Sequence, residues 1–274
     1  MPADSETGAN GGARSPLLDA LRADPPRTAI LTDVDGTLAP IVERPERAAV
    51  PQRARELLAA LSERYGLVGC ISGRRAREAR ELVGVGDLAY AGNHGLELLL
   101  PADDEVRLDP ALTGREREAA DFLAGPAGEG LGASGLRRED KGPIQALHWR
   151  QAEEEGGAEA RAEEIAAGAR RAGLEPRWGR KVLELRPVGV GGKDAAVAAL
   201  LAPRELSAAI YAGDDRTDLD AGRRLHELRD AGQLRTAAFV GVLSPEAPAE
   251  LAEESDLNVE GAEGWLELLA ELAA

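Results

Sequence analysis

Short apolar runs alternate with amphipathic stretches in the first hundred and the last ninety or so residues of the chain. The apolar runs predict buried strands at 29–34, 67–71, 88–91, 208–212 and 236–240. The amphipathic stretches predict helices at 51–64, 192–201, 218–230 and 262–273. A further charged helix is predicted after Ser72-Gly73-Arg74, and it ends at Leu82. Strands that alternate with helices are typical of βαβ units, which build a mostly parallel sheet covered by helices. We therefore predict an α/β fold for these parts.

The pattern changes in the middle of the chain. Residues 101–136 are acidic and rich in glycine, and a helix is predicted within them at 115–123. The residues that follow predict a strand at 144–150, a helix at 159–172 and a strand at 181–186. These elements suit a compact α+β cap inserted into the core. We therefore expect a core made of 27–105 and 187–274, a cap at 106–186 and a flexible polar tail at 1–26.

Composition narrows the classes of partner. The formal charge of −16 argues against a protein that binds nucleic acid or an anionic membrane, because both need a basic face. No apolar stretch approaches the roughly 18 residues that span a bilayer. The only cysteine, Cys70, excludes an internal disulfide and lies in an apolar run, as a small buried side chain would. We expect a cytoplasmic monomer.

Two carboxylates directly follow the first apolar run. Asp33 and Asp35 stand at positions i and i+2, followed by Gly36 and Thr37. At the carboxyl end of a buried strand they would lie where open α/β sheets bind their ligands. One carboxylate could attack a substrate while the other handles a proton. The competing interpretation is a strand that ends in an Asp-Gly turn.

Three further groups are expected at the same edge of the sheet. Ser72 follows the second strand and begins a helix, which suits a phosphate contact. Lys193 begins another helix after two glycines, and it is one of only three lysines (with Lys141 and Lys181) among 33 basic residues. Asp214 and Asp218 follow the strand 208–212. Taken singly, each could be a helix cap or a solvated residue.

The carboxylates expected at this edge would repel one another unless some are protonated or a divalent cation lies among them. Two close carboxylates repel each other by about 4 kcal/mol at 4 Å and an effective dielectric constant near 20. Carboxylate oxygens with partial hydration favour Mg²⁺. A carboxylate nucleophile, an acid–base group, Mg²⁺, a lysine and a hydroxyl together predict phosphoryl transfer. Gly192-Lys193 is followed by Asp194 rather than Ser or Thr, so it is not a P-loop.

These motifs resemble those of the haloacid dehalogenase-like (HAD) phosphohydrolases, and more closely the trehalose-6-phosphate phosphatase branch. The segments that carry the resemblance are Asp33–Pro40, Ser72–Arg74, Gly92–Glu97, Glu139–Gly142 with His148–Arg150, Gly179–Pro187 and Gly213–Asp220. The resemblance implies a Rossmann-like parallel core with an inserted α+β cap. It also implies a Mg²⁺-dependent phosphatase that converts trehalose 6-phosphate into trehalose and phosphate through an aspartyl-phosphate.

The resemblance also assigns roles to residues of the core. Asp33 would be the nucleophile, and Asp35 the acid and then the base. Ser72, Gly73 and Lys193 would hold the phosphate, and Lys193 would also be a catalytic residue. The resemblance implies a metal site of four aspartates: Asp33, Asp35 through its carbonyl, Asp214 and Asp218, the last directly or through water.

In the cap, the resemblance assigns five residues to the sugar: Glu139, Lys141, His148, Glu184 and Arg186. Leu219 and Gly222 depart from the family pattern, which usually has an acid and an aromatic residue there. These departures bear on the sugar and not on the phosphatase chemistry, so another substrate, such as sucrose phosphate or a glycosyl-glycerol phosphate, stays open. A separate alternative is a sugar-phosphate-binding protein without catalytic activity, which would be expected to lack Asp33 or Asp35, and both are present. The partner expected in every case is a small sugar phosphate.

Overall fold

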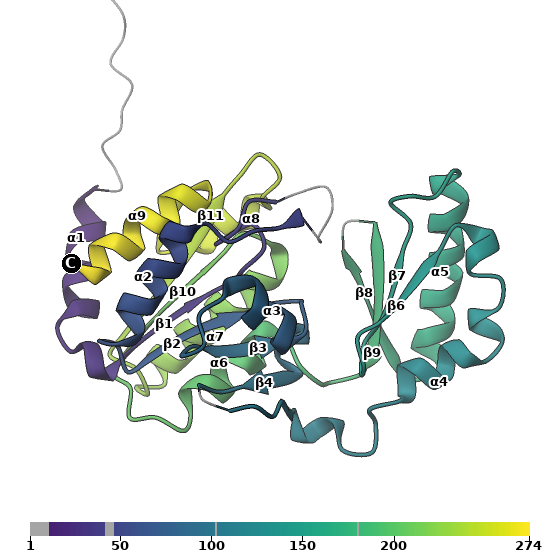
Figure 1. Cartoon of the computed structure of the whole chain (residues 1–274), viewed down its shortest axis with the longest axis horizontal. Coiled ribbons are helices and arrows are strands. Elements are labelled where there is room, and N and C mark those ends of the chain that lie inside the picture. Colours follow the sequence, from purple (N-terminus) through teal and green to yellow (C-terminus); the bar gives the residue numbers. More distant parts are fainter. Residues whose placement is uncertain (1–10, 42–46, 102, 180) are drawn as a thin grey trace, which may run out of the picture. The chain divides into compact units, whose positions relative to one another are not determined.

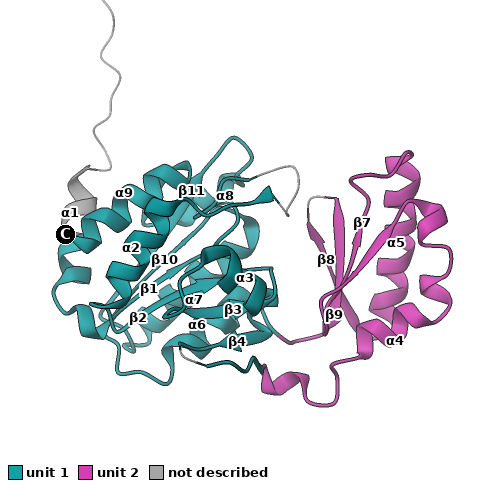
Figure 2. Cartoon of the chain, in the orientation of Figure 1, with its two compact units in different colours: residues 1–107, 191–274 teal, residues 108–190 magenta. Residues whose placement is uncertain are grey.

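The computed structural model describes residues 11–41, 47–101, 103–179 and 181–274. The chain divides into two compact units, and Figure 2 colours them separately. Unit 1 comprises Met1–Arg107 and Gly191–Ala274, and unit 2 comprises Leu108–Val190. The fold of unit 1 is built from two parts of the chain that flank unit 2 in the sequence.

An eight-stranded sheet forms the centre of unit 1, in the order β12-β11-β10-β1-β2-β3-β4-β5. Its strands are β1 (Thr28–Thr32), β2 (Leu67–Ile71), β3 (Ala89–Gly92), β4 (Glu97–Leu99), β5 (Arg107–Leu108), β10 (Ala208–Gly213), β11 (Thr236–Leu243) and β12 (Leu257–Glu260). The strands from β12 to β3 pair in parallel, and β4 pairs with β3 antiparallel. The predicted α/β class is confirmed.

Helices cover both faces of this sheet (Figure 1). One face packs against α1 (Gly11–Arg22), α2 (Gln52–Ser62), α3 (Ala76–Val83) and α9 (Gly261–Ala273). The other face packs against α6 (Lys193–Leu201), α7 (Arg216–Asp230) and α8 (Ala249–Glu254). Because β1 is buried on both faces, Ile30 enters one core while Ala29 and Leu31 enter the other. This explains why such strands are continuous apolar runs rather than alternating ones.

The N-terminal segment differs from the flexible tail expected at 1–26. Residues 1–10 lie outside the described residues, but Gly11–Arg22 form α1. Leu18 and Leu21 of this helix are fully buried in the core that α9 also lines. Their spacing of three residues places both on one face of the helix. For this part of the tail the expectation was wrong, because two leucines suffice to dock a short helix.

Unit 2 is a four-stranded antiparallel sheet in the order β6-β7-β9-β8, with helices on one side of it. Its strands are β6 (Arg137–Asp140), β7 (Gln145–His148), β8 (Leu174–Gly179) and β9 (Val182–Pro187), and its helices are α4 (Glu118–Ala124) and α5 (Glu155–Arg171). Leu147, Leu183 and Leu185 pack with α5 in the apolar core of the unit. The residues that alternate with them point to the opposite, open face of the sheet.

Short 3₁₀ segments occur at Pro25–Arg27, Asn93–Gly95, Pro110–Leu112, Pro126–Gly128 and Gly132–Ser134. Across the described part of the chain, none of the helices combines the length and the apolar character needed to cross a membrane.

Candidate active site

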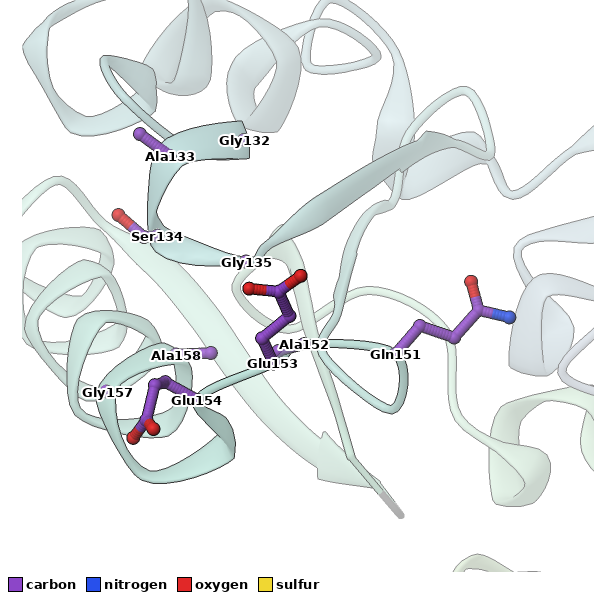
Figure 3. Close-up of a pocket in the computed structure, with 10 residues that line it drawn as sticks. All are labelled: Gly132, Ala133, Ser134, Gly135, Gln151, Ala152, Glu153, Glu154, Gly157 and Ala158. Atoms are coloured by element: carbon purple, nitrogen blue, oxygen red, sulfur yellow. The ribbon is translucent and has the colours of Figure 1, made fainter.

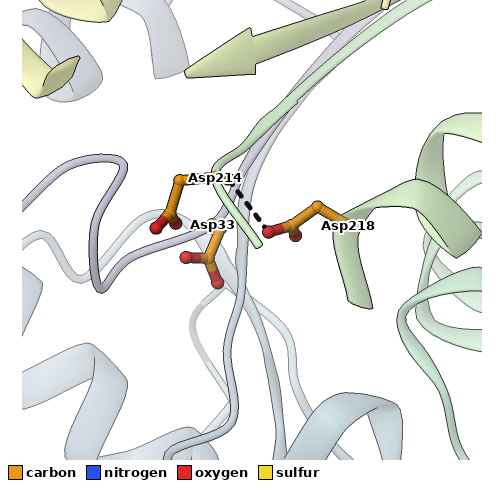
Figure 4. A group of neighbouring side chains, drawn as sticks. All are labelled: Asp33, Asp214 and Asp218. Atoms are coloured by element: carbon orange, nitrogen blue, oxygen red, sulfur yellow. Dashed lines mark hydrogen bonds between the residues drawn. The ribbon is translucent and has the colours of Figure 1, made fainter. Parts of the chain in front are cut away.

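The carboxyl ends of β1 and β10 bring three aspartates together. The backbone N–H of Asp33 donates to the carbonyl of Ala212 over 2.8 Å, which sets Asp33 beside the end of β10. Asp33 and Asp214 are 5% and 7% exposed, and Asp218 is fully buried. One oxygen from each of the three carboxylates lies within 4.8 Å of the others, and Figure 4 shows the group. The structure therefore unites residues that are up to 185 positions apart in the sequence.

The Asp-Gly-Thr turn after β1 is shaped around Asp214. Gly36 has a φ of 96°, and a Cβ at this position would lie 2.0 Å from Asp214 Oδ2. Only glycine fits so close an approach in this conformation. Thr37 Oγ1 donates to Asp214 Oδ1 over 3.1 Å. The turn thus serves to pack and orient a carboxylate from another strand, rather than merely to reverse the chain.

Lys193 lies between two of the carboxylates. Its Nζ donates to Asp33 Oδ1 over 2.7 Å and to Asp218 Oδ1 over 2.6 Å, and the residue is 3% exposed. Burial alone would lower the pKa of Lys193, but the charges of Asp218 and Asp33 outweigh it and raise that pKa well above its ordinary value. The side chain is therefore a buried, fully charged ammonium at neutral pH.

Both oxygens of Asp218 accept hydrogen bonds. Oδ1 accepts from Lys193 and from the hydroxyl of Tyr211. Oδ2 accepts from the backbone N–H groups of Asp214 and Asp215, over 3.0 and 2.9 Å. These four bonds fix Asp218 as the link between the start of α7 and Lys193. Tyr211 is a member of this network that the sequence analysis did not identify.

Asp215 begins α7 as its N-cap. Its Oδ1 accepts from the N–H groups of Thr217 and Asp218, over 2.7 and 3.3 Å. Burial pushes the pKa of Asp215 upward, but Lys193 and the hydrogen bonds from Thr217 and Asp218 prevail and bring it to about 2. Asp215 therefore remains a carboxylate and acts as a helix cap.

Asp33 and Asp214 are each buried close to other negatively charged carboxylates. Burial raises the pKa of Asp33 well above its ordinary value, and Asp218 and Asp214 add to the rise while Lys193 opposes it. Burial and Asp218 raise the pKa of Asp214 to about 7. A divalent cation would relieve this crowding. The atoms that could bind a metal ion here are all carboxylate oxygens, so the residues present fit a hard cation such as Mg²⁺.

Ser72 and Gly73 follow β2, the neighbour of β1 on the other side. Ser72 is 1% exposed, and its Oγ accepts from the backbone N–H of Arg74 over 3.1 Å. Gly73 lies against the imidazole of His94, whose Nε2 would be 2.8 Å from a Cβ on Gly73. Ser72 and Gly73 therefore stand at the same edge of the sheet as Asp33, just after the end of the adjacent strand.

The turn after β3 connects this edge to Lys193. The N–H of His94 donates to the carbonyl of Ser72 over 2.9 Å, and the carbonyl of His94 accepts from Gly192 N–H over 2.6 Å. Asn93 and His94 have φ values of 49° and 54°, a left-handed conformation that is uncommon outside glycine. Asn93 is held there by Glu97, whose Oε1 accepts from Asn93 Nδ2 over 2.8 Å. The turn thus fixes the start of α6, on which Lys193 stands.

Asp35 lies apart from the group of three carboxylates. Its side chain is 43% exposed and forms an ion pair with Arg74. Arg74 Nε donates to Oδ2 and Arg74 Nη2 donates to Oδ1, each over 2.7 Å. Arg74 belongs to the Ser72–Arg74 motif, but the sequence predicted no role for it. The ion pair joins loops 39 residues apart, so no local pattern could have shown it.

All five cap residues expected to meet the sugar belong to unit 2. Glu139, Ala146 and Glu184 are register partners across β6, β7 and β9, so they share the open face of the sheet. Lys141 Nζ donates to Glu184 Oε1 over 2.9 Å. His148 Nε2 lies 2.7 Å from Glu139 Oε2, and this hydrogen bond is the main reason why the pKa of Glu139 is lowered.

Arg186 stands on the same face, where β8 adds two residues that the sequence analysis missed. Arg186 Nε donates to Glu175 Oε2 over 3.1 Å, and Arg177 Nε donates to Glu175 Oε1 over 2.9 Å. Burial and the nearby charge of Arg177 lower the pKa of Arg186. A face that alternates carboxylates with cations can both accept hydrogen bonds from hydroxyl groups and donate to their oxygens.

The two departures from the expected pattern after Gly213 are explained by packing. Leu219 is 3% exposed and lies in the core that Phe239 also lines. A Cβ on Gly222 would lie 2.3 Å from Cδ1 of Phe239. The glycine therefore lets α7 approach the ring on β11. Both residues therefore contribute to the core of unit 1.

A surface hollow of about 560 Å³ lies elsewhere, in unit 2. Figure 3 shows its lining, which comes from the 3₁₀ turn at Gly132–Ser134, Gly135, the segment 151–154 before α5, and the beginning of α5. Glu153 and Glu154 contribute carboxylates, and the residues around the hollow include no lysine or arginine. The two carboxylates would repel a phosphate and no cationic side chain in the lining would attract it, so this hollow is no candidate for the phosphate site.

Comparison with known proteins gives a family match over most of the chain. The trehalose-phosphatase family model matches residues 31–244. Trehalose 6-phosphate phosphatase RA3 of Zea mays is 31% identical over 261 residues, which cover 89% of this chain and 69% of that protein. A Mycobacterium tuberculosis protein described as an uncharacterized glycosyl hydrolase is 37% identical over 206 residues. Those residues cover 71% of this chain but only 15% of that much longer protein.

A solved structure shows the same fold. The C-terminal domain of trehalose-6-phosphate phosphatase from C. albicans superposes with a TM-score of 0.77 and covers 99% of both chains, at 21% sequence identity. The expected family resemblance and the expected fold are both confirmed by these matches.

Proposed function

Because the chain belongs to the trehalose-phosphatase family, we propose that it hydrolyses trehalose 6-phosphate to trehalose and inorganic phosphate. The observation that carries the proposal is the cluster of Asp33, Lys193, Asp214 and Asp218 at the carboxyl edge of the sheet. It lies within the matched residues and combines a nucleophile with a fixed cation and candidate metal ligands.

In the first step of the proposed reaction, an oxygen of Asp33 attacks phosphorus. A new P–O bond forms to Asp33, the P–O bond to the sugar breaks, and Asp35 gives its proton to the departing sugar oxygen. In the second step, water attacks the phosphorus of the aspartyl-phosphate and Asp35 takes up the water's proton. The bond to Asp33 then breaks and phosphate is released. Lys193, Ser72 and Gly73 would hold the phosphate oxygens through both steps.

Asp33, Asp214 and the carbonyl of Asp35 would hold Mg²⁺ in this site. When bound, the ion would neutralise charge on the phosphate and on the crowded carboxylates. We assign Asp218 a supporting role, because its oxygens already accept four hydrogen bonds. Asp218 would keep Lys193 directed at Asp33.

We further propose that side chains of unit 2 recognise the sugar. Glu139 and Glu184 would accept hydrogen bonds from hydroxyl groups, and Lys141 would donate to hydroxyl oxygens. His148 and Arg186 would complete this set. A site whose polar groups need those partners rejects compounds that lack them by about 10⁴–10⁵-fold.

The test is phosphate release from trehalose 6-phosphate, sucrose 6-phosphate and glucose 6-phosphate, each with Mg²⁺ and with a chelator. We expect the highest kcat/KM for trehalose 6-phosphate and loss of activity in the chelator. Asp33→Asn serves as the matched control, because it keeps the size of the side chain and removes the nucleophile. A preference for another substrate refutes the sugar assignment, and more than a few per cent activity in Asp33→Asn refutes the covalent step.

A further inference from the structure

The proposed chemistry leaves one prominent ion pair of unit 1 without a role. Arg74, after β2, binds both carboxylate oxygens of Asp35, after β1, over two contacts of 2.7 Å. This is the paired arrangement in which the planar guanidinium matches a carboxylate, and it restricts orientation as well as distance. It holds the one carboxylate to which the proposed function assigns both proton transfers.

Two hydrogen bonds hold the backbone of Arg74 in place. Its N–H donates to Ser72 Oγ over 3.1 Å, and its carbonyl accepts from Asn93 N–H over 2.7 Å. The hydrogen bond with Asp35 is also the main reason why the pKa of Arg74 is raised. The backbone of Arg74 is therefore fixed to Ser72, in the proposed phosphate site, and to the turn after β3.

Asp35 has a fixed backbone, and among the described residues its side chain forms hydrogen bonds only with Arg74. The turn around it is closed by Gly36 N–H to Ala39 O over 2.7 Å and by Ala39 N–H to Val34 O over 2.9 Å. The carboxylate is 43% exposed, in contrast to the buried Asp33. Without a partner, an exposed aspartate changes rotamer freely, and a group that must transfer protons needs to stay within about 2.6–3.2 Å of the reacting oxygen.

We infer that Arg74 is a positioning residue, which acts on the reaction by holding the carboxylate of Asp35 in one orientation. The inference rests on the proposed function. In this role Arg74 acts on the reaction through Asp35 rather than through a contact of its own with the substrate. Misplacing a reacting group by about 1 Å costs on the order of 10²-fold in rate. Lysine offers a single charge without the planar pair of donors, so it replaces arginine only in part.

The test compares Arg74→Gln and Arg74→Lys with Arg77→Gln, a matched change on the exposed side of α3. Each is assayed with saturating Mg²⁺ on trehalose 6-phosphate and on p-nitrophenyl phosphate. Nitrophenolate leaves without a proton, so the first step on this substrate does not need Asp35, whereas the second step does. Rapid mixing therefore separates the two steps.

For Arg74→Gln we expect kcat on trehalose 6-phosphate to fall by about 10- to 100-fold with KM within threefold of the wild type. On p-nitrophenyl phosphate we expect a rapid burst of nitrophenolate approaching one equivalent per site, followed by slow turnover. Arg74→Lys should lie between Arg74→Gln and the wild type, and Arg77→Gln should match the wild type. The double variant Arg74→Gln/Asp35→Asn should be no slower than Asp35→Asn alone, because both changes disable the same group.

Three results would overturn the inference. One is a kcat of Arg74→Gln within twofold of the wild type. Another is loss of the burst with a raised KM on both substrates, which would make Arg74 a phosphate ligand. The third is a double variant that is slower by the product of the single effects. Arg74→Lys supplies the same comparison if Arg74→Gln does not fold. A wild-type chain that hydrolyses neither substrate overturns the proposed function and this inference together, whereas the three results above leave the proposed function intact.

Discussion

Replacing Lys193 by methionine tests the electrostatics of the site most directly. The ammonium is 3% exposed and bridges Asp33 and Asp218 over 2.7 and 2.6 Å. Methionine keeps much of the volume but removes the charge, so two buried carboxylates lose their cation. Removing one partner of a buried ion pair costs about 3–5 kcal/mol in the free energy of unfolding. We expect a loss of this size at neutral pH in the absence of Mg²⁺.

The pH dependence follows from the direction of the pKa shifts. The pKa values of Asp33 and Asp218 are already raised in the folded protein, chiefly by burial, and loss of Lys193 removes the charge that opposes the rise. A carboxyl whose folded pKa lies above its unfolded pKa binds more protons when folded, so its contribution to stability is present at low pH and is lost as the pH rises. The difference between Lys193→Met and the wild type should therefore be larger at pH 7.5 than at pH 5.

Denaturant melts of the transition of unit 1, recorded in a chelator at both pH values, measure this difference. Lys181→Met is the matched control, since Lys181 makes an exposed ion pair with Glu155 in unit 2 and should lose no more than ~1 kcal/mol. Added Mg²⁺ should stabilise Lys193→Met more than the wild type, because it would supply a cation that the variant lacks. A loss below ~1 kcal/mol at pH 7.5, or a loss that grows on acidification, would refute the reasoning.

Three further variants test single contacts. Tyr211→Phe removes a buried hydroxyl donor from Asp218 and should lower the free energy of unfolding by about 1–3 kcal/mol, measured in denaturant melts. Gly222→Ala places a Cβ 2.3 Å from the ring of Phe239 and should cost about 1–3 kcal/mol of stability in the same assay, with kcat little changed. Glu184→Ala should reduce kcat/KM for trehalose 6-phosphate far more than for p-nitrophenyl phosphate, since only the former has hydroxyl groups for unit 2 to bind.

For each of these three variants, one result would contradict the prediction. Unchanged stability of Tyr211→Phe would mean that the hydroxyl contributes nothing to holding Asp218. A Gly222→Ala protein of normal stability would show that α7 does not need its close approach to β11. Equal losses of Glu184→Ala on both substrates would remove unit 2 from sugar recognition.

The strands of unit 1 were largely predictable because of where they lie. β1, β2 and β10 are buried on both faces, so their sequences are continuous apolar runs with clear ends. Strand β6 was missed because its residues, Arg137–Asp140, are all charged and lie at the edge of a sheet with one open face. Helix α1 was missed because two buried leucines in a polar segment give a weak pattern.

For the candidate site, the order of the motifs along the chain indicated which residues belong to it, whereas their hydrogen bonds could not be inferred. Asp33, Ser72, Lys193 and Asp214 each follow an apolar strand or begin a helix, and parallel strands end at one edge of the sheet. The sequence could not separate the role of Asp218 from that of Asp214, because that depends on the four bonds that Asp218 accepts.

The amino-acid sequence by itself therefore determined the fold class, the family and most of the candidate residues, since these depend on periodicity and on short motifs that are read locally. Only the tertiary structure decided which polar and charged groups meet: Lys193 with Asp33 and Asp218, Arg74 with Asp35, and Tyr211 with Asp218. The physical reason is that electrostatic energy depends on distance and burial in space. Neither quantity is set until strands far apart in the chain are paired.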